Sequence, residues 1–246
     1  MYLTIRAIVL RVTDYNDRDA LLTLLSRDHG KLTVKARGLR RKNSPLIAPC
    51  QLLAYGEFTL FEYRGMYTVN EAHSIELFRN LRRDLTKLSL GTYFAQVTEV
   101  ISQEDLPNPE LQSLLLNSLY ALSQLQLSEN LVKAAFELRA ACLAGYTPDL
   151  SGCHNCGNEN ADRFDLSAGQ LVCLSCRAGE GGIRVPVNAG IIHGLRYICF
   201  CDAKKLFSFT LGDDNLDKLS SLTEAYLTTQ LERGFSTLDF YKSLLI

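Results

Sequence analysis

The sequence predicts an α+β protein of several parts: an N-terminal five-stranded β-barrel, an α-helical domain, and a four-cysteine zinc ribbon inserted into that domain. Three observations predict this fold. The first 76 residues read as short strands with glycine at the turns. From about Leu81 apolar residues recur at helical spacing. Two Cys-x2-Cys pairs then separate two helical stretches. The predicted ranges are 1–79 (barrel), 80–150 and 187–246 (helical domain), and 151–186 (ribbon).

The barrel prediction rests on five strand-like segments. They cover residues 3–13, 20–25, 31–35, 57–63 and 66–70. By hydrophobicity alone, residues 20–25 also fit a short helix, but the turn at 27–30 and the β-type residues that follow favour a strand. About five strands in so short a segment are typical of a barrel of the oligonucleotide-binding (OB) type.

The helical prediction rests on apolar residues spaced three and four apart. Leu81, Leu85 and Leu88 begin the pattern, which continues over 111–122 after the breaker Leu106-Pro-Asn-Pro109. A third face runs over 131–142 and is stopped by Gly145 and Pro148. A further helix covers 216–227, and the last follows Ser236, which we expect to be its N-cap.

The inserted segment is predicted to bind metal. Cys153 and Cys156 form one Cys-x2-Cys pair, and Cys173 and Cys176 form another after sixteen intervening residues. Each pair can aim two sulfurs at one ion, and two pairs supply the tetrahedral thiolate shell that zinc prefers. Residues 164–167 and 170–172 read as a hairpin around Ala168-Gly169. A closed shell has no position for substrate, so we expect one structural Zn²⁺ ion.

The composition is that of an ordinary globular protein. Of 246 residues, 47% are hydrophobic and 22% are charged. No run of 18 apolar residues occurs, and the N-terminus lacks the features of a signal peptide, so we expect no membrane segment. The four other cysteines, Cys50, Cys142, Cys199 and Cys201, lie in apolar surroundings that fit reduced thiols in a cytoplasm. Cys199-Phe-Cys201 is either core packing, the reading that we favour, or a second metal motif.

Positive charge is concentrated near the N-terminus. Residues 1–80 hold 12 Lys and Arg against 8 Asp and Glu, a net +4, whereas the rest of the chain has a net −5. No acidic residue occurs from His29 through Gly56. Basic side chains neutralise nucleic-acid phosphates, and OB barrels commonly bind single strands, so this stretch is the predicted DNA-binding site; the alternative is an ordinary solvated loop. Its residues are Lys31, Lys35, Arg37, Arg40, Arg41 and Lys42.

Four aromatic residues are candidates for stacking on bases: Phe58, Phe61, Tyr63 and Tyr67. Because they alternate along strands, some must belong to the core. No catalytic pattern stands out, since the four histidines lack paired acids at triad or metal spacing and no phosphate-binding loop occurs. We therefore expect no enzyme activity. Asp213, Asp214 and Asp217 fit the start of a helix better than a magnesium site.

Several motifs together resemble the bacterial RecO family of recombination mediators. They are Phe136-Glu-Leu-Arg139, Gly145-Tyr-Thr-Pro148, Cys153-x-x-Cys156-Gly157, Phe164-Asp-Leu-Ser167 and Gly169-x-Leu-Val-Cys173-x-x-Cys176. Val9-Leu10, His29-Gly30-Lys31 and Ala36-Arg37-Gly38 are similar to that family's opening barrel, and Leu231-Glu-Arg233 with Phe235–Leu238 to its C-terminal helices. The resemblance thus covers nearly the whole chain, in the same order.

The resemblance implies an OB domain, a helical domain and a zinc module. It also implies a cytoplasmic, nucleoid-associated protein of DNA repair and recombination in the RecF pathway. Such a protein binds single- and double-stranded DNA, anneals complementary strands and helps load the RecA recombinase onto strands coated by single-strand-binding protein (SSB). The implied partners are RecR and the acidic C-terminal tail of SSB.

Two alternative functions, from other classes of protein, also fit the sequence. A zinc-ribbon protein of transcription or translation would account for the ribbon and the basic loop, and it would prefer RNA or protein. A thiol oxidoreductase would use one Cys-x-x-Cys pair and hold no stoichiometric zinc.

Overall fold

The computed structural model describes residues 1–176 and 182–245, so residues 177–181 of the predicted ribbon range lie outside the described residues. The chain divides into two compact units. The first unit joins Met1–Leu125 to the C-terminal segment that begins at Phe235, and the second covers Gln126–Gly234. Among the described residues, no helix is both long and apolar enough to cross a membrane.

Five strands of the first unit form a closed barrel, which confirms the predicted OB-like fold. The strands are β1 (Tyr2–Asp14), β2 (Ala20–Ser26), β3 (Gly30–Ala36), β4 (Tyr55–Tyr63) and β5 (Met66–Glu76). They neighbour one another in the order β1-β2-β3-β5-β4. The parallel β3–β5 pair and the antiparallel β1–β4 pair close the ring. Inward-facing side chains such as Val9, Leu24, Val34 and Phe58 fill the interior.

The segment 20–26 is a strand because it pairs with both β1 and β3. Its unbroken apolar sequence has a simple cause: one face lines the barrel core, and the other lies against helix α2 (Pro109–Gln124). Gln112 of α2 donates a hydrogen bond from Nε2 to the Leu25 carbonyl at 2.8 Å. Burial on both sides removes the polar alternation that marks a half-exposed strand.

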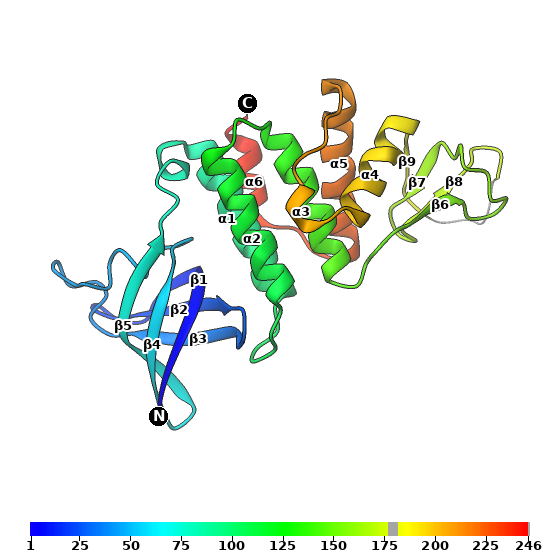
Figure 1. Cartoon of the computed structure of the whole chain (residues 1–246). Coiled ribbons are helices and arrows are strands. Elements are labelled where there is room, and N and C mark those ends of the chain that lie inside the picture. The colour runs from blue at the N-terminus through cyan, green and yellow to red at the C-terminus, as the bar shows by residue number, and fades with distance from the viewer. Residues whose placement is uncertain (177–181, 246) are drawn as a thin grey trace. The chain divides into compact units, whose positions relative to one another are not determined.

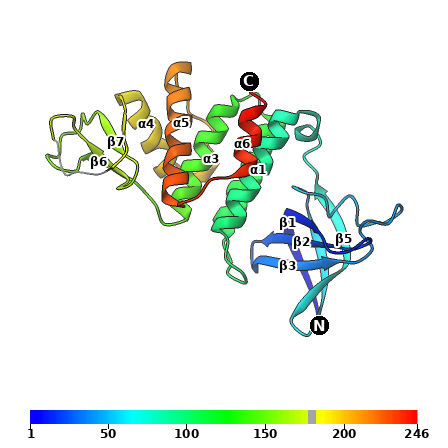
Figure 2. The ribbon, with the colours of Figure 1, turned by 180° about the vertical axis from the view of Figure 1, so that it is seen from behind.

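Three α-helices and a short 3₁₀ turn complete the first unit. The turn η1 (Leu81–Arg83) leads into α1 (Leu85–Ile101), whose N-cap Asp84 accepts a hydrogen bond from the Lys87 N–H. Helix α2 opens on the predicted Pro109, with Asn108 as its N-cap. The last helix, α6 (Ser236–Ser243), packs on α1 in both ribbon views (Figure 1, Figure 2).

One helix start differs from the prediction. Ser236 is the first helical residue of α6, and the N-cap position belongs to Phe235. The Phe235 ring is buried edge-on against Tyr93, with 5.5 Å between ring centroids, and this packing sets where the chain enters the helix. Aromatic burial therefore outweighs the preference of serine for the cap.

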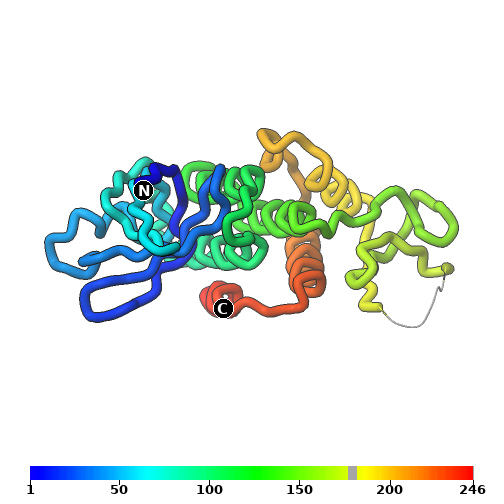
Figure 3. Tube along the Cα trace, turned by 90° about the horizontal axis from the view of Figure 1, so that it is seen from below, coloured from blue at the N-terminus to red at the C-terminus, as the bar shows by residue number. Residues whose placement is uncertain are grey.

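Helices α3 (Glu129–Leu143), α4 (Ala189–Phe200) and α5 (Asp213–Gln230), with the 3₁₀ turn η2 (Ala203–Lys205), form the helical part of the second unit. Gly145, with a φ of 96°, follows the end of α3 as predicted. Asp213 and Asp214 occupy the first turn of α5, which fits their expected helix N-terminal role. Figure 3 traces the chain from α5 into α6.

A small four-stranded sheet lies between α3 and α4 in the chain. It contains β6 (Asp149–Cys153), β7 (Arg163–Asp165), β8 (Gln170–Val172) and β9 (Arg184–Pro186), in the order β6-β8-β7-β9. The β7–β8 hairpin is the predicted one. Helix α5 supports the sheet: the Tyr226 ring lies edge-on to Phe164 at 5.3 Å, and Gln230 donates to the Leu166 carbonyl at 2.7 Å.

A buried ion cluster also joins α3 to α5, and nothing in the sequence pattern indicates it. Lys133 Nζ lies 3.0 Å from Glu137 and 2.8 Å from Glu224, and the Lys133 and Glu137 side chains are 4% and 0% exposed. Burial, opposed by the Lys133 charge, raises the pKa of Glu137. The hydroxyl of Thr223 donates to Glu137 at 2.8 Å, which satisfies the carboxylate further.

Candidate metal centre and nucleic-acid interface

The structure brings the four predicted metal ligands together. Cys153 ends β6, Cys156 lies in the following turn, and Cys173 and Cys176 follow β8. Their four Sγ atoms all lie within 4.8 Å of one another, and Cys156 and Cys173 are 4.0 Å apart. A Zn–S bond of about 2.3 Å places neighbouring thiolates of a tetrahedron about 3.8 Å apart. The cluster therefore fits one metal ion, and His154 is exposed beside it.

Backbone N–H groups around this cluster stabilise a negative charge on Cys153. Burial opposes ionisation of Cys153, but N–H groups of Cys156, Asn155 and Cys173 point at its sulfur and lower its pKa to about 6. The Cys173 N–H lies 3.2 Å from that sulfur. Burial and the neighbouring thiols raise the pKa of Cys173 to about 12. A metal ion bound between the sulfurs would relieve this mutual repulsion as it displaces the thiol protons.

The basic stretch begins on the outward face of β3. Leu32, Val34 and Ala36 are buried, so Lys31 and Lys35 point the other way, as the strand parity predicts. Both lysines are already engaged. Lys31 Nζ donates to the Glu99 carbonyl at 3.3 Å and lies 3.8 Å from Glu104, while Lys35 Nζ lies 3.2 Å from Asp19. The two side chains are 18% and 17% exposed, which limits their access to a ligand.

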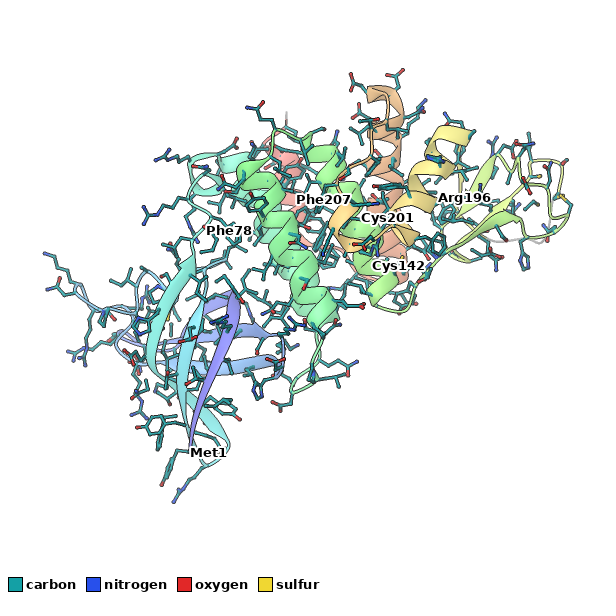
Figure 4. The ribbon with its side chains drawn as sticks, viewed as in Figure 1. Met1, Phe78, Cys142, Arg196, Cys201 and Phe207 are labelled. Carbon is teal, nitrogen blue, oxygen red and sulfur yellow. The ribbon has the colours of Figure 1, made fainter. Side chains whose placement is uncertain are left out.

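The other four basic residues occupy an exposed loop after β3. Arg40 pairs with Asp14 at 2.8 Å. Arg37, Arg41 and Lys42 are exposed, and within residues 1–176 and 182–245 no ion pair is formed by them. We call these three the free loop cations. Nitrogen-tipped side chains project from this loop in Figure 4.

The β1–β2 loop supports the basic loop. The Gly38 N–H donates to Asp19 Oδ1 at 2.9 Å, and the Arg40 N–H donates to the Arg18 carbonyl at 3.1 Å. Gly38 has a φ of 67°, a conformation that favours glycine. The two loops extend side by side from the barrel as the deep-blue and lighter-blue segments of Figure 3. Asp19 thus sets the path of the basic loop.

An outward row of side chains on the barrel connects Lys35 to an aromatic surface that the sequence only partly indicates. Tyr2 pairs with Phe61, Phe61 with Thr68, and Thr68 with Lys35, so these four side chains form one outward row across the barrel. The Tyr2 and Phe61 rings lie 5.2 Å apart and are 62% and 38% exposed. Tyr2 was not among the predicted aromatics. The predicted strand begins at residue 3, whereas the observed β1 begins at Tyr2, and its pairing with β4 places the Tyr2 ring beside Phe61.

The four predicted stacking candidates separate into two groups. Phe58 is fully buried in the barrel core, and Tyr67 packs partly against that core. Phe61 and Tyr63 are exposed, Tyr63 to 61%, and the Arg64 guanidinium lies 5.2 Å from the Tyr63 ring centroid. Once Phe58 points inward, strand alternation places Phe61 outward. Phe61 and Tyr63 are therefore the two exposed candidates, Tyr67 is half-buried, and Phe58 belongs to the core.

Comparison with known proteins gives consistent matches along the chain. The family models described as "Recombination protein O N terminal" and "Recombination protein O C terminal" match residues 1–78 and 82–239. A "DNA repair protein RecO" of Acetivibrio thermocellus is 34% identical over 245 residues, covering 99% of this chain and 97% of the relative. Proteins of the same name from Alkaliphilus metalliredigens and Bacillus subtilis are 28% and 27% identical; these alignments cover 99% and 89% of this chain and 100% and 86% of the relatives.

Proposed function

The chain belongs to the RecO family of DNA repair proteins, and on that basis we propose that it is a recombination mediator that binds single- and double-stranded DNA and anneals complementary strands. One observation supports the proposal above all: the same closed barrel exposes both the free loop cations and several aromatic side chains. Cations bind the phosphates and aromatic rings stack on bases, which is the usual combination for single strands.

The six basic residues are proposed to act unequally. Arg37, Arg41 and Lys42 would contact phosphates directly, because no carboxylate in the described part of the chain neutralises them. Arg40 would exchange Asp14 for a phosphate. Lys31 and Lys35 would contribute mainly to the local potential, since carboxylates already hold both. Neutralising the phosphates of two strands reduces their repulsion and lets complementary bases meet.

The wider role of the family is proposed for this chain too. It would help load RecA onto SSB-coated strands, with RecR and the SSB C-terminal tail as partners, at the nucleoid in the cytoplasm and without catalysing a reaction. The ranges 1–79, 80–150, 151–186 and 187–246 are the proposed domain limits.

We propose that the four-cysteine cluster holds one structural zinc ion, because four thiolates at tetrahedral spacing match the preference of zinc. The ion would bind Cys153, Cys156, Cys173 and Cys176 and stabilise a sheet of four short strands. So small a sheet has little core of its own.

An annealing assay tests the proposal. Two complementary labelled strands are mixed with the protein, with and without SSB, and with RNA strands of the same sequence in parallel. Faster DNA annealing, persisting on SSB-coated strands, is the expected result. Binding to RNA with no acceleration of DNA annealing would favour the alternative of a zinc-ribbon protein of transcription or translation. Metal analysis tests the hypothesis of a thiol oxidoreductase, because one zinc per chain would exclude a free, redox-active dithiol.

A further inference from the structure

A second group of cysteines lies in the second unit, outside the metal cluster. Cys142 is the penultimate residue of α3, and Cys199 is the penultimate residue of α4. Their Sγ atoms lie 3.7 Å apart although 57 positions separate them in the chain. Figure 4 labels Cys142 and Cys201 in this region. In the described residues only the Cys153 cluster has metal-ligand geometry, so Cys199-Phe-Cys201 is not a second metal motif.

Arg139 places a positive charge beside these thiols. It lies three residues before Cys142 on α3, hence on the same helix face. Its Nη2 donates to the Cys201 carbonyl at 2.8 Å and to the Cys201 sulfur at 3.2 Å. Its buried Nε has no acceptor within the described part of the chain. A guanidinium with a spare donor stabilises an anionic sulfur or oxygen formed nearby.

The two thiols differ in reactivity and access. In the neutral pair the Cys142 thiol donates toward the Cys199 sulfur at 3.7 Å. Once Cys142 loses its proton, Cys199 becomes the donor, and this hydrogen bond, helped by Thr147 and Arg139 and opposed by burial, lowers the pKa of Cys142 to about 7. The same hydrogen bond, with burial, raises the pKa of Cys199. Cys142 is half-buried, whereas Cys199 is 9% exposed. This is the arrangement of an attacking thiolate with a resolving thiol behind it.

We propose that Cys142 and Cys199 form a peroxide-reactive pair that closes to an intramolecular disulfide, with Cys142 as the attacking sulfur. The sulfurs would have to approach by about 1.7 Å to reach S–S bonding distance. Both belong to the last turn of a helix, where a small local adjustment is least costly.

The chemistry balances in two steps. The Cys142 thiolate attacks one peroxide oxygen, an S–O bond forms, the O–O bond breaks, and the departing hydroxide takes a proton to become water. The Cys199 sulfur then attacks the sulfenic sulfur: the S–S bond forms, the S–O bond breaks, and the oxygen leaves as water with the thiol proton. Overall two thiols are oxidised and one hydrogen peroxide is reduced to two waters.

Mapping with chymotrypsin tests the pair on the full-length, zinc-loaded protein. This protease cleaves after aromatic residues, so cleavage after Tyr146 separates Cys142 from Cys153, and cleavage after Phe200 separates Cys199 from Cys201. After brief treatment with hydrogen peroxide at pH 7, we expect one dominant cross-linked peptide pair, Cys142 to Cys199, which dithiothreitol reverses. A cross-link of Cys142 to Cys201, or no cross-link while other thiols oxidise, would overturn the proposal.

Single variants identify the attacking sulfur. Cys199→Ser should leave a sulfenic acid on Cys142 that dimedone traps, whereas in Cys142→Ser dimedone labelling of Cys199 should be lower by about tenfold or more. Cys50→Ser is the matched control, because burial raises the pKa of Cys50 to about 12 and it should not alter the cross-link. Equal labelling in the two single variants would refute the assignment. The wild-type map needs no variant, so it decides the pairing even if a serine variant misfolds.

Discussion

Asp19 and Lys35 form the contact that organises the predicted DNA-binding surface. Lys35 Nζ lies 3.2 Å from Asp19 Oδ2, and the other carboxylate oxygen of Asp19 accepts the Gly38 N–H at 2.9 Å. One carboxylate therefore joins β3, the β1–β2 loop and the start of the basic loop. The Gly38 N–H, Asn16 and Lys35 outweigh the effect of burial and lower the pKa of Asp19 from 3.8 to about 2.

The first prediction concerns Asp19→Asn and pH. The pKa of Asp19 is lower in the folded protein than in the unfolded chain, so its ionised carboxylate stabilises the fold at pH values above about 3.8. This stabilisation is lost as the pH falls from about 3.8 through about 2. Wild type should therefore have a higher urea midpoint than Asp19→Asn at pH 7, and the gap should narrow at pH 2.5. Circular dichroism measures both midpoints. Asp17→Asn, an exposed change in the same loop, is the control and should show no such gap.

The second prediction concerns the free loop cations. Arg41→Ala with Lys42→Ala should weaken single-strand binding and flatten its salt dependence by about 1.4 in log–log slope, since each lost phosphate contact removes about 0.7. Adding Arg40→Ala should have a smaller further effect because Asp14 already pairs with it. Fluorescence anisotropy at several salt concentrations measures both. Lys204→Ala with Lys205→Ala removes equal charge from an exposed turn, and an identical loss in that control would argue against a loop site.

The third prediction concerns base stacking by Tyr63. Tyr63→Ala should cost about 1 kcal/mol of single-strand binding, or roughly fivefold in affinity, while leaving the salt slope unchanged. Tyr120→Ala removes a similarly exposed tyrosine from α2, 54% against 61% exposed, and should leave affinity unchanged. If Tyr63→Ala binds like wild type, stacking does not occur at this end of β4.

The fourth prediction concerns the buried ion cluster of the second unit. Lys133→Met removes the cation between Glu137 and Glu224 and leaves buried carboxylates without it. The free energy of unfolding should fall by about 3–5 kcal/mol. Chemical denaturation measures this, with the exposed Lys218→Met on α5 as control. A loss below about 1 kcal/mol would mean that the cluster relaxes or takes up a proton at little cost.

The fifth prediction concerns the metal. Wild type should contain one zinc per chain, and Cys153→Ser should lose it and unfold at lower temperature, because metal binding contributes to folding. DNA binding by the folded fraction should persist, since the proposed contacts lie in the other compact unit. Cys50→Ser should keep its zinc. If Cys153→Ser folds but no longer binds DNA, the DNA-binding site does not lie where we propose it.

Much of the molecule follows from local pattern. Strand alternation and glycine turns predicted the five barrel strands, and Cys-x2-Cys spacing predicted which thiols converge, because both depend on near neighbours in the chain. The motifs around Gly145 and the cysteines pointed to the family that the comparisons show. These features can be predicted from the sequence because each depends on a few neighbouring residues or on one hairpin.

Tertiary structure alone decided how the charges and thiols are used. The stretch 31–42 reads as six equivalent cations, yet Glu104, Asp19 and Asp14 engage Lys31, Lys35 and Arg40 and leave three free. Strand register placed Tyr2 beside Phe61, and helix packing brought Cys142 to Cys199. An ion pair or thiol contact depends on distance in space, and sequence separations of 16 to 73 residues carry no local signal of it.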